Sequence, residues 1–130
     1  MSLVARENAW GSGSAVALTT ALVSATKFKT RSANAIRLGC TTSATAATSV
    51  DLAIEWSEDG GTTWYRLMAI NSVSGGSVDH DDGLWVGSGA NGYHELMASV
   101  PSNVELRVSA KRTGGDATSA LVAQAILTRE

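Results

Sequence analysis

The sequence is poor in residues that cross-link a chain or carry it into a membrane. Its one cysteine, Cys40, excludes an intramolecular disulfide, and Cys40 shares the two-residue period of Ile36 and Leu38. It is therefore predicted to be a small buried hydrophobe rather than a reactive thiol. Apolar runs of only a few residues exclude a membrane-spanning helix, and the charged start disfavours a signal peptide. We expect a protein made in a reducing cytoplasm.

Charged residues are also scarce. They make up 17% of the chain, against roughly 25% in average globular domains. The net charge of −2 argues against a general binder of polyanions, so nucleic acid is an unlikely partner. Alanine, serine, threonine and glycine fill about half of the sequence. Such a surface suits close packing against other proteins, although secreted sandwich modules share this composition.

Residues suited to catalysis are few and scattered. Only His80 and His94 could serve a nucleophilic triad, and no serine lies in a Gly-x-Ser-x-Gly elbow. No two carboxylates are singled out as an acid–base pair. No glycine-rich segment joins a strand to a helix as a phosphate-binding loop would. A non-enzymatic protein without a cofactor is expected.

The densest acidic segment covers residues 79–82. The carboxylates of Asp79, Asp81 and Asp82 could supply oxygen ligands to Ca²⁺. Their spacing does not fit an EF-hand loop, and acidic loops are often simply solvated. These three aspartates are weak candidates for a metal site.

What the chain does contain is a repeated two-residue period. Val50, Leu52, Ile54 and Trp56 alternate with other residues, and residues 104–111 alternate most cleanly. Turn-forming residues recur roughly every 8–12 positions, as in antiparallel all-β domains. The pattern predicts an all-β fold: a single antiparallel β-sandwich or jelly roll of about seven to eight strands.

The predicted domain covers residues 15–130, and residues 1–14 are predicted to form an N-terminal arm. Expected strands cover residues 15–25, 26–31, 35–41, 49–57, 64–70, 93–100, 104–111 and 121–127, with a short strand at 84–86 inside a long irregular stretch, 71–92. The core is expected to take Ile36, Leu38, Leu52, Ile54, Trp56, Leu106, Val108, Leu121 and Leu127.

A recognisable motif connects two of these strands. Residues 57–64 fit the Ser-x-Asp-x-Gly-x-x-Trp pattern of the Asp box, with Ser57, Asp59, Gly61 and Trp64 at its defining positions. The octet resembles the hairpin motif of sialidase propellers and of unrelated β-proteins, in which it is structural and remote from the active site. Asp59 is expected to accept hydrogen bonds from backbone N–H groups of its own loop.

Taken together, three features resemble small β-sandwich virion proteins of tailed bacteriophages. They are the Asp-box hairpin of residues 50–64, the segment 100–108 that leads into a Gly114-Gly115-Asp116 turn, and the small-residue composition with an N-terminal arm. The resemblance implies a capsid decoration (cement) protein of the virion, bound to the major capsid protein and commonly trimeric. A neck or tail component is the alternative within the same class.

Apolar residues that the core does not need are the expected partner contacts. They are Leu3, Val4 and Trp10 in the arm and Leu84, Trp85 and Val86 in the long loop. Trp10 is expected either to fold back on its own domain or to dock on a neighbour. A basic stripe, Lys27, Lys29 and Arg31, either guards an edge strand or matches an acidic partner surface.

A carbohydrate-binding or adhesin-like module is the competing hypothesis. A sugar platform needs exposed aromatic rings, which Trp85 could form with Tyr65 or Tyr93.

Overall fold

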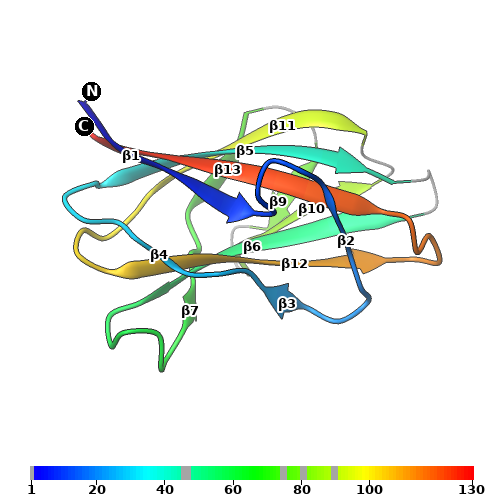
Figure 1. The fold of residues 1–130 in the computed structure, drawn as a ribbon, viewed down its shortest axis with the longest axis horizontal. Helices are drawn as coiled ribbons and strands as arrows, with labels where there is room; N and C mark the ends of the chain where they lie inside the picture. The colour runs from blue at the N-terminus through cyan, green and yellow to red at the C-terminus, as the bar shows by residue number, and fades with distance from the viewer. Residues whose placement is uncertain (1, 45–47, 74–75, 80–81, 89–90) are drawn as a thin grey trace.

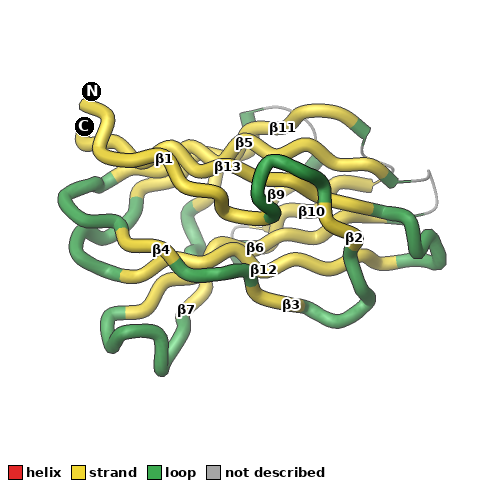
Figure 2. The backbone as a smooth tube through the Cα atoms, in the orientation of Figure 1, coloured by secondary structure: helices red, strands yellow, loops and turns green. Residues whose placement is uncertain are grey.

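The chain forms two antiparallel β-sheets packed face to face (Figures 1 and 2). The computed structural model describes residues 2–44, 48–73, 76–79, 82–88 and 91–130, and no helix occurs among them. Sheet A has the order β1 (Ser2–Trp10), β13 (Ala120–Arg129), β5 (Ala35–Ser43), β11 (Gly92–Ser99) and β8 (Ile70–Ser72), with β2 (Val16–Ala17) also on β13. Sheet B has the order β3 (Val23–Ser24), β12 (Glu105–Thr113), β6 (Ser49–Ser57), β10 (Leu84–Ser88) and β9 (Ser77–Asp79); β4 (Phe28–Lys29) also pairs with β12 and β7 (Tyr65–Arg66) with β6. The all-β sandwich prediction is confirmed.

The strand order is that of a jelly roll. β6 pairs with β10, β5 with β11, β3 and β4 with β12, and β1 with β13, so the pairs are nested from the middle of the chain outward. The chain therefore behaves as one long hairpin rolled into two sheets, with the first and last strands side by side (Figure 1). The two ends of the chain meet at one corner of sheet A.

Alternation in the sequence produces the core. Along β5, buried Ile36, Leu38 and Cys40 alternate with outward residues, and β12 and β13 alternate in the same way over most of their length. The expected core residues are buried, with one exception: Trp56 is only half-buried and packs against the core from its edge.

The expected N-terminal arm is instead a strand. Residues 2–10 form β1, which runs antiparallel to β13 from Ser2 opposite Arg129 to Trp10 opposite Ala123. Ala9 and Trp10 are buried at its end. Of the two outcomes expected for Trp10, the structure has the one in which it folds back on its own domain. Without β1, the edge of β13 that faces away from β5 would lack a hydrogen-bonding partner from Ala123 to Arg129.

Two other segments also differ from expectation. Residues 15–25 do not form one strand, because the chain crosses there from sheet A to sheet B and pairs only briefly, as β2 and β3. The long stretch after residue 70 contains β9 and β10, and β10 is an interior strand between β6 and β9. The short strand expected at residues 84–86 is confirmed and runs to residue 88.

Candidate partner-binding surfaces

The Asp-box loop is held by its own side chains. Ser57 Oγ donates to Asp59 Oδ1 (2.7 Å) and accepts from the N–H of Gly61 (2.9 Å). Asp59 Oδ1 also accepts from the N–H groups of Thr62 (3.0 Å) and Thr63 (2.8 Å). These bonds, that from Thr63 first and then the Ser57 hydroxyl, hold the pKa of Asp59 well below its usual range. The backbone hydrogen bonds expected of Asp59 are therefore present.

Trp64 and two basic side chains from outside the motif hold the loop in place. Trp64 Nε1 donates to the carbonyl of Gly61 (2.9 Å), and the Arg107 guanidinium lies 4.1 Å from the centre of the Trp64 ring. Lys27 Nζ donates to the carbonyl of Gly60 (2.6 Å). The loop is thus tied to β12 through Trp64 and to the connection between β3 and β4 through Lys27.

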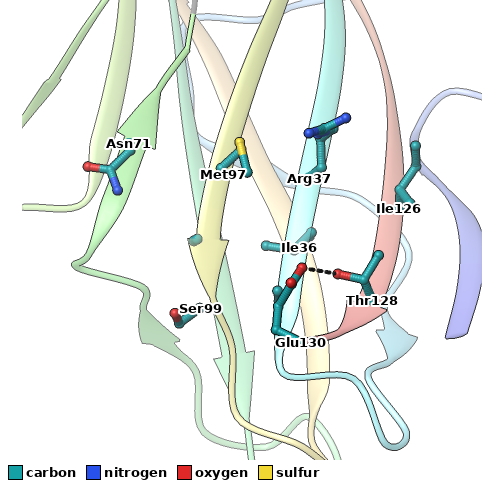
Figure 3. Close-up of a pocket in the computed structure, with 10 residues that line it drawn as sticks. Ile36, Arg37, Asn71, Met97, Ser99, Ile126, Thr128 and Glu130 are labelled. Atoms are coloured by element: carbon teal, nitrogen blue, oxygen red, sulfur yellow. Dashed lines mark hydrogen bonds between the residues drawn. The ribbon is translucent and has the colours of Figure 1, made fainter. Parts of the chain in front are cut away.

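The outer face of sheet A combines two arginines with apolar and polar side chains. Directly opposite residues on neighbouring strands point to the same face, and one row across the sheet reads Arg6, Ile126, Arg37, Met97 and Asn71. A shallow groove of about 350 Å³ lies over this row, and Figure 3 shows its side chains on neighbouring strands. Thr128 Oγ1 donates to Glu130 Oε1 (3.1 Å) at one end of the groove.

Further exposed apolar side chains extend this face. Leu3 is opposite Thr128 and is 54% exposed, and Tyr93 is opposite Thr41 and is 59% exposed. Met97 is 39% exposed at the centre. We call these residues, with the central row, the sheet A face.

The outer face of sheet B differs in that it carries ion-paired side chains. Arg107 Nε donates to Glu55 Oε1 (3.0 Å), and the hydroxyl of Ser109 donates to the same oxygen. Lys27 lies 3.9 Å from Glu105. A partner that docked here would have to displace or desolvate these pairs, which is costly.

The expected contact residues do not share one surface. Leu3 lies on the sheet A face, and Val4 is half-buried against the core. Leu84 and Val86 are half-buried and oppose Ala53 and Asp51 on the outer side of sheet B. They are therefore on the opposite side of the sandwich from Leu3.

The expectation that Trp85 is exposed is wrong, and Trp10, expected either to fold back or to dock on a neighbour, is folded back and buried. Trp10 is only 7% exposed and Trp85 is fully buried. Trp85 opposes Leu52, so the parity of β10 turns its ring inward, where it lies 5.2 Å from the ring of His94. Gly76 covers it so closely that a Cβ there would collide with the indole. Sequence alternation around residue 85 was too short to reveal this parity.

The residues proposed for a sugar platform are also separated. Tyr65 is in β7 of sheet B and Tyr93 in β11 of sheet A, both exposed, whereas Trp85 lies in the core between the sheets. The aromatic platform that the carbohydrate-binding hypothesis requires is not assembled.

Groups for metal or covalent chemistry are not gathered in the described part of the chain. It contains no cluster of three histidine, cysteine or acidic residues suited to a metal ion. Asp79 Oδ1 accepts from the N–H of Asp82 (3.2 Å), and Asp81 and His80 lie outside the described residues. Burial raises the pKa of Cys40 to about 12, so its thiol stays protonated at neutral pH. This agrees with the predicted buried hydrophobe.

Comparison with known proteins gives no relative. No family model matches the sequence, and neither curated proteins nor solved structures yield a significant match. Within the described residues, no helix is long and apolar enough to cross a membrane.

Proposed function

We propose that this protein is a non-enzymatic structural subunit of a bacteriophage virion, a decoration protein that attaches to the capsid through its sheet A face. The observation that carries the proposal is the contrast between the two outer faces. Sheet A presents Leu3, Tyr93, Met97 and Ile126 beside Arg6 and Arg37, which form no ion pair with a described residue, whereas sheet B carries the Arg107–Glu55 ion pair.

Physical reasons support docking through sheet A. A partner that covers exposed apolar groups removes them from water, which favours association. Interfaces are enriched in methionine, aromatic residues and arginine, and the sheet A face carries Met97, Tyr93 and Arg37. The jelly roll itself is an architecture that virion proteins and lectins both use. Because the aromatic platform for sugars is not assembled, the structural role is the better supported of the two.

The partner is proposed to be the major capsid protein or another virion subunit at the neck or tail. A homotrimer is the proposed assembly, since a symmetric oligomer multiplies weak contacts made by each copy.

Co-sedimentation tests this proposal. Purified protein is mixed with capsids of the encoding phage that lack it, and its oligomeric state is measured separately by analytical ultracentrifugation. We expect a trimer that pellets with capsids in a saturable manner. A monomer that never pellets with capsids or tails would contradict the proposal, and retention on a glycan array would instead support the carbohydrate-binding alternative.

A further inference from the structure

A second recess lies at the Asp-box end of the sandwich, away from the sheet A face. It has a volume of about 390 Å³ and is lined by Lys29, Arg31, Ser57, Glu58, Gly60, Asn103, Val104 and Glu105. We call it the Asp-box groove. Three connections form its walls: the Asp-box loop, the turn after β4, and the connection between β11 and β12, which lie at the same end of the molecule (Figure 1).

Several polar groups around this groove already have partners. Ser57 is bonded within the Asp-box loop. Lys27, next to the groove, bonds the carbonyl of Gly60 and lies 3.9 Å from Glu105, so Glu105 has a counter-charge. The side chains of Lys29, Arg31 and Asn103 make no hydrogen bond or ion pair with any described residue, and neither does Glu58 at the rim.

Two of the residues without a side-chain partner, Arg31 and Asn103, have an unusual backbone conformation. Arg31 has φ 54° and Asn103 has φ 59°, the only described residues other than glycine in the left-handed region. The N–H of Asn103 donates to the carbonyl of Arg31 (2.7 Å), which locks the two turns together. Asparagine tolerates this conformation, but arginine gains nothing from it locally. Strain retained at a surface recess suggests that the Arg31 side chain has a role there.

The charges select the class of ligand. The unpaired groups that line the groove are two cations and an amide, against the single carboxylate of Glu58. This balance is complementary to carboxylates, which accept charge-assisted hydrogen bonds from lysine and arginine. No aromatic residue lines the groove, so the stacking surface that single-stranded nucleic acid uses is missing.

We propose that the Asp-box groove binds an acidic peptide segment of a partner protein, with its carboxylates on Lys29 and Arg31 and a further acceptor on the Asn103 amide. The inference rests on the proposed function, which it deepens by naming the chemistry of a partner. The three residues of the basic stripe then have different roles. Lys27 is bonded to the Asp-box loop, whereas Lys29 and Arg31 are available to bind the partner.

Fluorescence anisotropy with a labelled peptide of alternating Asp and Glu tests the proposal at low ionic strength. A peptide of alternating Asn and Gln is the neutral comparison, and single-stranded DNA of equal length is the nucleic-acid comparison. The test variant is the double substitution Lys29→Gln and Arg31→Gln. The matched control, Arg6→Gln with Arg37→Gln, removes the same charge from the sheet A face.

We expect the wild type to bind the acidic peptide but not the neutral one. The test variant should bind about tenfold more weakly, and the control should bind like the wild type. Arg31→Gly guards against misfolding, because it relieves the positive φ: it should keep its melting temperature and still lose affinity.

Equal binding by the test variant, an equal loss in the control, or tighter binding of DNA than of the peptide would each overturn the proposal. The assay contains no capsid. A failure here with intact co-sedimentation would reject the groove alone, whereas peptide binding without co-sedimentation would reject the capsid assignment alone.

Discussion

At the scale of single residues, the Asp-box loop shows how far sequence reasoning reaches. The motif gave the positions of Ser57 and Asp59, and their hydrogen bonds are local, spanning at most four residues. Local bonds of this kind follow from the order of residue types. The docking of Trp64 under Arg107 could not be predicted, because it joins residues that are distant in sequence.

Removing the Ser57 hydroxyl should destabilise the protein. Ser57 is fully buried, and its hydroxyl donates to the Asp59 carboxylate and accepts from the N–H groups of Asp59 and Gly61. We expect Ser57→Ala to lower the free energy of unfolding by about 1–3 kcal/mol, the range for an orphaned buried partner. Urea denaturation measures this loss. An unchanged midpoint would show that the loop is not part of the cooperative fold.

Acid should weaken the fold through Asp59. The pKa of Asp59 is lower in the folded protein than in the unfolded chain, so the ionised form stabilises the fold. This contribution is fully present above the unfolded pKa of about 3.9 and is lost as the pH falls toward the folded value. Asp59→Asn lacks a titrating group, so its melting temperature should fall less steeply than that of the wild type below about pH 4. If the melting temperatures of Asp59→Asn and of the wild type fell equally from pH 7 downward, this assignment would be contradicted.

At the scale of strands, prediction succeeded where the two-residue period is unbroken. β5, β6 and β12 were located because each alternates over many residues. β1 was mistaken for an arm because its register against β13 shifts between Leu3 and Ala5 and again between Asn8 and Trp10. Each bulge changes which face the following side chains occupy, so the strand has no constant period to detect.

Trp10 is expected to anchor β1. Its ring is buried, but its indole N–H has no hydrogen-bond partner in the described structure. Because the ring is buried, Trp10→Ala should lower the free energy of unfolding by about 3–5 kcal/mol. Trp10→Phe keeps most of the apolar volume and removes only the unpaired donor, so it should cost much less. Chemical denaturation of both variants tests this, and equal losses would show that the ring does not fill the core.

At the scale of the whole molecule, the sandwich is a nearly neutral body with two unlike faces. The jelly-roll class followed from composition, strand spacing and the scarcity of helix-forming segments. The functional surface did not follow, because it depends on which strands become neighbours: Arg6, Ile126, Arg37 and Met97 are far apart in sequence and form one row only in the folded sheet. Of the apolar residues expected to be exposed near position 85, Trp85 is instead buried in the core.

The most direct test of the proposed docking face compares two methionines in the capsid co-sedimentation assay. Met97 lies at the centre of the sheet A face and is 39% exposed, and Met68 follows β7 of sheet B and is 45% exposed. Both Met97→Glu and Met68→Glu should fold normally, because surface substitutions usually change stability by about 0.5 kcal/mol or less. We predict that Met97→Glu abolishes saturable binding to capsids while Met68→Glu binds as the wild type does. Normal capsid binding by Met97→Glu, or loss of binding by Met68→Glu alone, would contradict docking through sheet A.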